Sequence, residues 1–307
     1  MSSSTKVSFL SNGIKVVGDL YSPAPATPDR RGAALVIGHP FTGVKEQTAT
    51  LYAKYFAQNG FYALAFDAAY QGESEGEPRS LENPAQRVED FKSAITYLTT
   101  LTGKVDPERI GAVGVCAGGG YACAAAASDV RIKAVVPIVP FCTGRAGRHN
   151  GGNESDKFNP EAIVGSLKLS ADTRNAIAQG KLVEPITMTP DSLDQLPPDA
   201  SFMRKGFHYY KGEGFHPRST GKVHPLSFDH MVTFDSFAFN NLISPRPMLV
   251  FGGETAETLH FAKTAYERAN EPKKLVIVKD KGHFDLYSDA SEVGSVATEW
   301  LTKYLCN

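Results

Sequence analysis

The sequence predicts an α/β protein with a mostly parallel, doubly wound sheet of about eight strands and one inserted cap. Short apolar runs of strand length alternate along the chain with segments in which apolar residues recur at helical spacing. Several of those runs are apolar at every position, as expected of strands that are buried on both faces. One long interruption, residues 141–242, separates the last two expected strands from the rest.

The first expected element is an antiparallel hairpin. Its strands, residues 7–10 and 14–20, are separated by Asn12-Gly13, a dipeptide that supplies the positive φ angles of a tight turn. Buried strands then follow in chain order at residues 33–38, 61–66, 110–115, 134–139, 248–251 and 275–278. Helices are expected at residues 45–59, 88–98, 118–127, 259–269 and 292–304. Strands that alternate with helices in this way pair in parallel through right-handed crossovers.

The interruption predicts the domain organisation. Residues 141–242 contain only short helical candidates and an aromatic, histidine-rich patch. A segment of this length is too long for an ordinary loop in a compact domain. We therefore expect a core formed by residues 1–140 and 243–307, with residues 141–242 inserted as a cap.

Composition excludes several classes of protein. The 307 residues include 32 Lys plus Arg and 33 Asp plus Glu, so the formal net charge is −1, which argues against a general nucleic-acid binder. No apolar run approaches the ~20 residues that cross a bilayer, and the N-terminus lacks the apolar stretch of a signal peptide. We expect a soluble cytoplasmic protein without a membrane partner. Its four cysteines show no CxxC spacing, which favours reduced thiols.

The segment Gly114-Val115-Cys116-Ala117-Gly118 leaves an expected strand and opens an expected helix. It matches the G-x-S-x-G nucleophile elbow with cysteine in place of serine. A nucleophile on such a sharp turn needs tiny residues two positions away on either side. The helix N-terminus favours a thiolate, so we predict that Cys116 is the nucleophile. The alternative is a glycine-rich turn around a small buried cysteine.

A cysteine nucleophile needs a base and a residue that orients the base. His283 follows the last expected strand, where hydrolases of this type carry their histidine, and it is the predicted base. The acid is expected after strand 248–251, where Glu257 is favoured over Glu254. Either glutamate could instead begin the following helix, and Asp285 is a weaker candidate.

Two backbone N–H groups are expected to bind the developing oxyanion. One belongs to Ala117, and the other to Phe41, with Thr42 as the alternative. His39 is expected to shape this loop, and Asp67 to brace it. The cap supplies aromatic residues that form either an apolar acyl pocket or a small core of the cap itself. They are Phe202, Phe207, Tyr209, Tyr210, Phe215, Phe234, Phe237 and Phe239.

These motifs resemble the dienelactone-hydrolase-like branch of the α/β-hydrolase superfamily, which includes fungal polyketide transferases and thiohydrolases. The resemblance implies the α/β-hydrolase fold and a Cys–His–acid triad. It also implies release or transfer of acyl chains in secondary metabolism, including chains held on a carrier protein. The sequence departs from the branch at Phe41-Thr42, where glycines are common, and in its acid loop, where Asp is more usual. The resemblance is carried by residues 39–40, 43–47, 114–119, 244–247, 271–274 and 282–287.

We therefore expect a hydrolase or acyltransferase that works through an S-acyl-Cys116 intermediate. Its small-molecule substrate would be an apolar acyl or polyketide-like thioester, ester or lactone. Neither a cofactor nor a metal is expected, because HExxH, paired-cysteine and GxGxxG patterns are absent from the sequence. Two alternatives remain, a C–C bond hydrolase or cyclase and a non-catalytic ligand-binding protein. A homodimer is left open.

Overall fold

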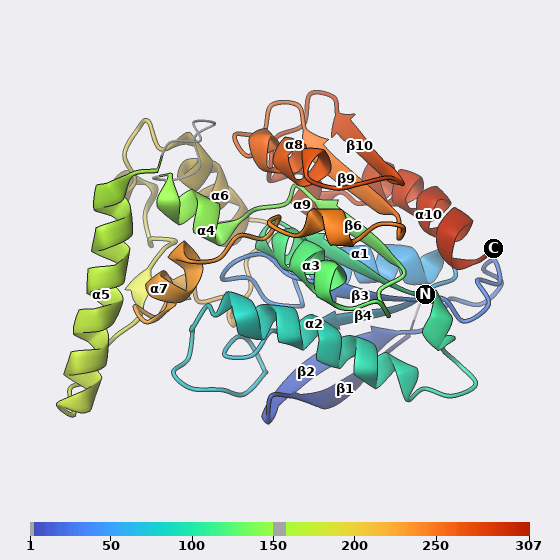
Figure 1. Cartoon of the computed structure of the whole chain (residues 1–307), viewed down its shortest axis with the longest axis horizontal. Helices are drawn as coiled ribbons and strands as arrows, with labels where there is room; N and C mark the ends of the chain where they lie inside the picture. The colour runs from blue at the N-terminus through green and yellow to red at the C-terminus, as the bar shows by residue number, and fades with distance from the viewer. Residues whose placement is uncertain (1–2, 150–157) are drawn as a thin grey trace.

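The computed structural model describes residues 3–149 and 158–307, and a large twisted sheet lies at the centre of these residues (Figure 1). The strand order is β1-β2-β4-β3-β5-β6-β9-β10. β1 and β2 form the predicted hairpin, β2 pairs antiparallel with β4, and every other pair is parallel. The predicted fold class is confirmed. The strand bounds are β1 Ser4–Ser11, β2 Ile14–Tyr21, β3 Ala34–Gly38, β4 Tyr62–Phe66, β5 Ile110–Val115, β6 Ala134–Ile138, β9 Met248–Gly253 and β10 Lys273–Val278.

Helices cover both faces of the sheet. α1 (Thr48–Gln58) and α10 (Ser291–Leu305) pack against each other on one face, and α2 (Pro84–Thr99) and α3 (Ala117–Ser128) pack together on the other (Figure 1). α8 (Leu259–Glu267) packs on β9 and β10. Because both faces are covered, β3, β5 and β6 are buried along their whole length, which explains their uninterrupted apolar sequences.

The segment between β6 and β9 forms a separate group of elements at one end of the molecule (Figure 1). None of its described residues joins the central sheet, because β7 and β8 pair only with each other. We call residues 141–242 the cap segment; residues 150–157 lie outside the described residues, and the division into core and cap stays a prediction. Its elements are α4 (Thr143–Arg148), α5 (Pro160–Ala178), β7 (Ile186–Thr187), a 3₁₀ turn (Leu193–Gln195), α6 (Ser201–Lys211), β8 (Lys222–Val223), α7 (Ser227–Val232) and a 3₁₀ turn (Asn240–Leu242).

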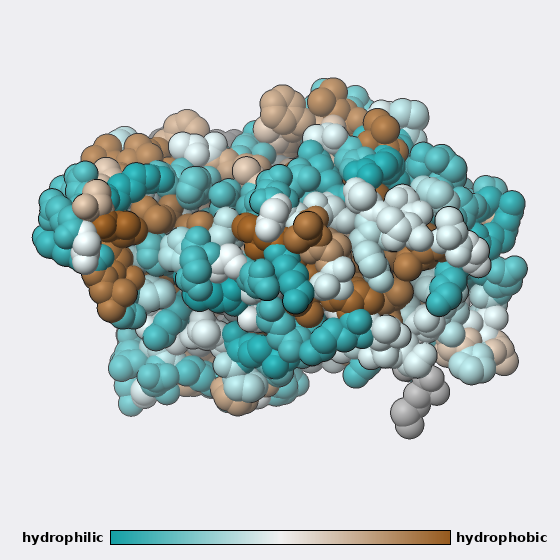
Figure 2. Space-filling view, turned by 90° about the horizontal axis from the view of Figure 1, so that it is seen from below, coloured by the Kyte–Doolittle hydropathy of each residue, from teal (hydrophilic) through white to brown (hydrophobic). Residues whose placement is uncertain are grey.

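The expectation of only short helices in the cap segment was wrong. α5 is 19 residues long and begins with a clear cap, because the Asn159 side chain accepts from the backbone N–H of Ala162 and Pro160 follows it. Only two polar residues of α5 are fully buried, Ser170 and Thr173, so the helix lacks the apolar periodicity of a packed one. Its exposed apolar side chains contribute to the brown surface at the left end of Figure 2.

Among the described residues, no helix combines the length and the apolar character needed to cross a membrane. A cytoplasmic location stays a prediction.

Candidate active site

The turn at Cys116 has a strained backbone that only this spacing of glycines allows. Cys116 lies between β5 and α3 with φ 57° and ψ −124°, a conformation that non-glycine residues rarely adopt. A Cβ atom on Gly114 would lie 2.1 Å from the carbonyl oxygen of Gly118. One on Gly118 would lie 2.4 Å from the carbonyl oxygen of Gly38. The helix can therefore pack this close to the sheet only with glycine at both positions.

Both predicted oxyanion donors lie at the cysteine. The backbone N–H groups of Ala117 and Phe41 and the side chain of Tyr287 lie near enough to the Cys116 sulfur to lower the pKa of its thiol. Cys116 is only 5% exposed, and burial has the larger effect and raises this pKa to about 11. Burial of the sulfur therefore acts against the thiolate that the helix N-terminus is expected to favour.

His283 is fully buried and hydrogen-bonded at both ring nitrogens. Its Nδ1 lies 2.5 Å from Thr258 Oγ1, and its Nε2 lies 3.0 Å from the Tyr287 hydroxyl. Burial lowers the pKa of His283 to about 3, so the ring is neutral. Among the described residues, no hydrogen bond joins Cys116 to His283, and the Tyr287 hydroxyl contacts both. We call Cys116, Tyr210, Thr258, His283 and Tyr287 the cysteine cluster.

Neither predicted glutamate hydrogen-bonds to His283. Glu257 accepts from Ser201 Oγ and Lys205 Nζ, both at 2.7 Å, and its charge acts on the imidazole only through space, where it raises the pKa of His283 against the effect of burial. Glu254 accepts from the backbone N–H of Asp280 at 2.9 Å. The position where a triad acid would bind Nδ1 is taken by Thr258.

Asp285 accepts from the backbone N–H of Gly282 at 2.6 Å and so braces its own loop. The sequence reasoning missed both Thr258 and Tyr287. Thr258 directly follows Glu257, the favoured acid, and Tyr287 lies four residues after the base. Neither spacing is a helix signal, because His283 precedes α9 (Asp285–Ser288) and so does not share a helix face with Tyr287.

His39 and Asp67 build the loop that carries Phe41. His39 is buried, with Nδ1 2.7 Å from the carbonyl oxygen of Pro40, while Ala68 N–H and Arg87 approach Nε2 at 3.0 and 2.9 Å. Burial and the Arg87 charge hold the pKa of His39 well below its usual value. The His39 ring is therefore neutral, and its hydrogen bonds shape the loop, as expected from the sequence.

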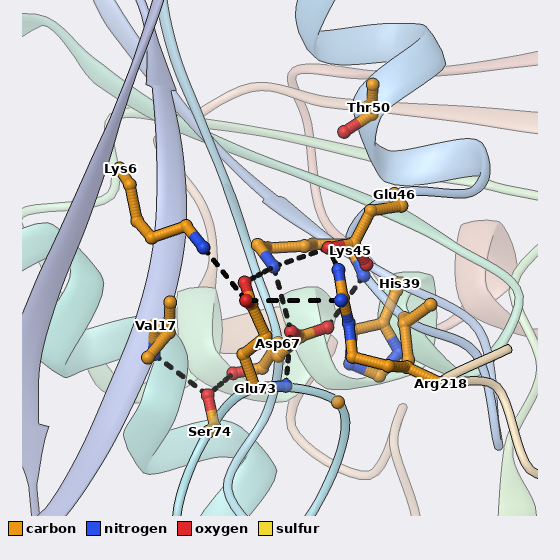
Figure 3. Close-up of polar contacts among 12 residues, drawn as sticks. Lys6, Val17, His39, Lys45, Glu46, Thr50, Asp67, Glu73, Ser74 and Arg218 are labelled. Carbon is orange, nitrogen blue, oxygen red and sulfur yellow. Dashed lines mark hydrogen bonds and ion pairs between the residues drawn. The ribbon is translucent and has the colours of Figure 1, made fainter. Parts of the chain in front are cut away.

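A second polar cluster surrounds Lys45, which directly precedes Glu46 in this loop (Figure 3). The Lys45 ammonium contacts carboxylate oxygens of Glu46 at 2.6 Å, Asp67 at 3.1 Å and Glu73 at 2.6 Å. Arg218 of the cap segment pairs with Glu46 and lies 4.0 Å from Glu73. We call these five residues the lysine cluster. The predicted bracing role of Asp67 is confirmed, since it also accepts from the backbone N–H groups of Lys45 and Glu73.

The three carboxylates lie close enough to hold one cation, with oxygens within 4.8 Å of one another. In this structure the Lys45 ammonium is that cation. Burial disfavours the charged amine, but the surrounding carboxylates outweigh burial and raise the pKa of Lys45. A hydrogen bond from Lys45 is the main cause that lowers the pKa of Glu73 to about 2.

The described residues of the cap segment make four polar contacts with residues 39–47, which we call the oxyanion loop. Ser219 Oγ donates to the carbonyl oxygen of Thr42 at 2.9 Å, and Tyr210 approaches that of Phe41 at 3.5 Å. The Gln47 side chain donates to a cap carbonyl, that of residue 214, at 2.5 Å. The fourth contact is the ion pair between Arg218 and Glu46. The two regions are therefore tied together beside the cysteine.

An apolar pocket of about 120 Å³ opens onto Cys116 and continues toward a larger cavity of about 580 Å³. Five residues line both: Phe41, Phe141, Met188, Phe202 and Met203. Of the predicted cap aromatics, Phe202, Phe207 and Tyr210 line the pocket at Cys116.

The other predicted aromatics lie elsewhere. Tyr209 and Phe215 line a separate cavity of about 230 Å³, and Phe239 is exposed. Phe237 is buried in the main core, and Phe234 packs against that core. Three of these aromatics thus line the pocket at Cys116, whereas Phe237 belongs to the main core and not to a small core of the cap itself.

The sequence pattern of the dienelactone hydrolase family matches residues 19–151. The chain is 37% identical over 297 residues to the uncharacterized protein PA2218 of Pseudomonas aeruginosa, covering 92% of this chain and 75% of that protein. It is 27% identical over 299 residues to the thiohydrolase aneE of Aspergillus aculeatus, covering 92% and 87% of the two chains.

Solved structures agree with these sequence relationships. The crystal structure of PA2218 superimposes with a TM-score of 0.89 at 33% identity, covering 99% of this chain and 94% of that one. The α/β hydrolase GrgF of Penicillium sp. sh18 superimposes with a TM-score of 0.81 at 23% identity, over the whole of both chains, and so supports the fold. With the matching family pattern, the α/β-hydrolase fold and a relative of this identity, the chain belongs to the dienelactone hydrolase family.

Proposed function

We propose that the protein is a cysteine-dependent hydrolase or acyltransferase acting on apolar acyl thioesters, esters or lactones through an S-acyl-Cys116 intermediate. The observation that carries the proposal is the position of Cys116. It lies on a strained turn, receives two backbone N–H groups and faces an apolar pocket. Donors held at such a point stabilise the charge that develops on a carbonyl oxygen during attack.

The proposed roles follow from the contacts. Cys116 attacks the carbonyl carbon, and His283 is the base that becomes protonated at Nε2. For Nε2 to act as a base, Nδ1 must carry the ring proton, which it donates to Thr258 Oγ1. Glu257 would support the imidazolium through its charge alone, as the acid of the triad. Ala117 and Phe41 would donate to the oxyanion.

The pocket and the relatives support the proposed substrate class. The cavity beyond Cys116 has room for a bulky acyl group, and Phe141, Met188, Phe202 and Met203 give it an apolar wall. Exchange between one thioester and another is nearly neutral in free energy, so thioesters suit a cysteine nucleophile. The relative aneE is named a thiohydrolase. We propose that residues 141–242 act as the cap that closes this cavity, and that the acyl group can arrive on a carrier protein.

Trapping the acyl-enzyme tests the proposal. The protein is incubated with a panel of acyl thioesters, aryl esters and enol lactones, quenched, and analysed by peptide mass spectrometry. Acyl mass on the Cys116 peptide is expected, with little on the peptide of Cys306, a partly exposed cysteine remote from the pocket. Addition of alcohols then separates a transferase from a hydrolase. No adduct from any member of the panel would overturn the proposal and favour a ligand-binding protein.

A further inference from the structure

We propose that Tyr287 is a catalytic residue whose hydroxyl carries the proton between Cys116 Sγ and His283 Nε2. The inference rests on the proposed function, because it assigns Cys116 and His283 as nucleophile and base. It departs from the direct thiol–imidazole pair that the sequence predicts.

The position of the hydroxyl carries the inference. Tyr287 lies on α9 (Asp285–Ser288), a single turn that begins two residues after His283 and folds Tyr287 back over the imidazole. The hydroxyl is 3.0 Å from His283 Nε2, and Tyr287 also acts on Cys116, because its side chain lowers the pKa of the thiol. Within the described part of the chain, Tyr287 is the one residue that hydrogen-bonds to the imidazole and lines the same pocket as Cys116.

The pocket supports the same assignment. Cys116 and Tyr287 both line the apolar pocket, whereas His283, fully buried, is not among the described residues that line it. A substrate in this pocket would meet the tyrosine hydroxyl before the imidazole. A proton that leaves the thiol or reaches the leaving group would therefore pass through Tyr287.

The resulting steps balance. As Cys116 Sγ bonds to the carbonyl carbon, its proton moves to the Tyr287 oxygen, the tyrosine proton moves to His283 Nε2, and the carbonyl π electrons move to oxygen. As the bond to the leaving group breaks, that group takes a proton from Tyr287, which regains one from Nε2. Water or an alcohol then attacks the S-acyl group, and its proton follows the same route until the thiol is restored.

The surroundings of the tyrosine suit such a relay. Burial is the largest cause that raises the pKa of Tyr287 well above its usual value, so its hydroxyl stays protonated and gains one proton as it gives another. Tyr210 lines the same pocket as Tyr287, and its hydroxyl lies 3.5 Å from the carbonyl oxygen of Phe41. Thr258 holds the opposite ring nitrogen of His283.

The test compares Tyr287→Phe with Tyr209→Phe. Each removes one hydroxyl and keeps the ring, but Tyr209 belongs to the neighbouring cavity and not to the pocket at Cys116. The rate constant for alkylation of Cys116 by iodoacetamide at pH 7 is measured by mass spectrometry of its peptide. We expect Tyr287→Phe to slow alkylation roughly 100-fold. Tyr209→Phe should match the wild type. Adding His283→Ala to Tyr287→Phe should slow it no further.

Unchanged or faster alkylation in a folded Tyr287→Phe variant would contradict the proposed proton transfer through Tyr287, because the hydroxyl would then only fill or block the site.

A second measurement needs only the wild type. The rate of Cys116 alkylation in mixtures of H₂O and D₂O should curve with the deuterium fraction, since two protons move, and a linear dependence would contradict the relay. If alkylation obeys these expectations but no acyl adduct forms, the proposed function fails and the relay stands.

Discussion

The cysteine cluster and the lysine cluster both contact the oxyanion loop, but they accommodate buried polar groups in opposite ways. The lysine cluster is ionised, and the ammonium of Lys45 is surrounded by three carboxylates. In the cysteine cluster, burial keeps both Cys116 and His283 uncharged. Buried charge is tolerated where partners are present, and is otherwise removed by a shift in pKa.

This difference in charge suggests different roles for the two clusters. A charge-matched cluster holds its groups in fixed positions, and this one joins β1, the oxyanion loop, the loop after β4 and the cap segment. A neutral cluster stores no ion pair, so its charges would exist only while a substrate reacts. We therefore expect the lysine cluster to brace the structure and the cysteine cluster to carry the proposed chemistry.

The largest effect should come from Cys116→Ala. Removal of the sulfur should lower turnover of any substrate found in the panel by on the order of 10³-fold or more, while the thermal midpoint changes little. Cys306→Ala, far from the pocket, should keep full activity. Steady-state kinetics and thermal unfolding of the same preparations check this. Activity that survives in Cys116→Ala would move the chemistry away from the cysteine cluster.

Lys45→Met should lower the free energy of unfolding by about 3–5 kcal/mol, because it leaves three neighbouring carboxylates without their shared cation. The matched control is Lys6→Met. Lys6 also binds Glu73, but its side chain is 63% exposed, and its loss should change stability by less than about 1 kcal/mol. Urea unfolding measures both. If the two substitutions lowered the free energy of unfolding equally, burial of Lys45 would not be what makes its charge important for stability.

Acid should weaken the cysteine cluster before the lysine cluster. The folded pKa of His283, about 3, lies below its ordinary 6.5, so this contribution to stability is complete above pH 6.5 and is lost as pH falls toward 3. The pKa of Glu73 is lowered from 4.5 to about 2 on folding, so the stability that Glu73 contributes is lost only as the pH falls from 4.5 toward 2. Between pH 6.5 and 5, His283 should therefore contribute a loss of about 2 kcal/mol.

Urea unfolding of variants separates the two contributions. His283→Gln should lose less stability than the wild type over this interval, although His39, whose pKa is also lowered, leaves part of the dependence in place. Glu73→Gln should parallel the wild type above pH 5. Parallel curves for the wild type and His283→Gln would show that His283 is not buried as a neutral ring.

The smallest expected effect is that of pH on catalysis. With pKa values of about 11 for Cys116 and about 3 for His283, neither group titrates near neutrality. The value of kcat/KM should therefore vary by less than about twofold from pH 5 to 9. If kcat/KM instead rose or fell with a midpoint between pH 6 and 8, Cys116 and His283 would form a thiolate–imidazolium pair in the resting enzyme.

The sheet could be predicted because each buried strand carries its own signal. β3 and β5 are apolar at nearly every position, and the Asn12-Gly13 turn marks the hairpin. α5 could not be found in the same way, because it buries little and so shows little periodicity. Local sequence encodes burial on a sheet far more strongly than it encodes an exposed helix.

In the candidate site, the positions that depend on local geometry were predicted and those that depend on packing were not. The Gly114–Gly118 spacing locates Cys116 without any tertiary information. Thr258 reaches His283 only because the ends of β9 and β10 are neighbours in the sheet. The contact between Lys45 and Asp67 likewise depends on the pairing of β3 with β4.

The glycines around Cys116 have a consequence for how related genomes should be interpreted. Gly114 and Gly118 are needed so that α3 can lie against the sheet, and that need is the same whether or not residue 116 is reactive. A descendant that lost its chemistry would still have to keep both glycines in order to fold. A match to the glycine pattern therefore indicates the backbone shape of this turn and says nothing of whether the residue at position 116 reacts.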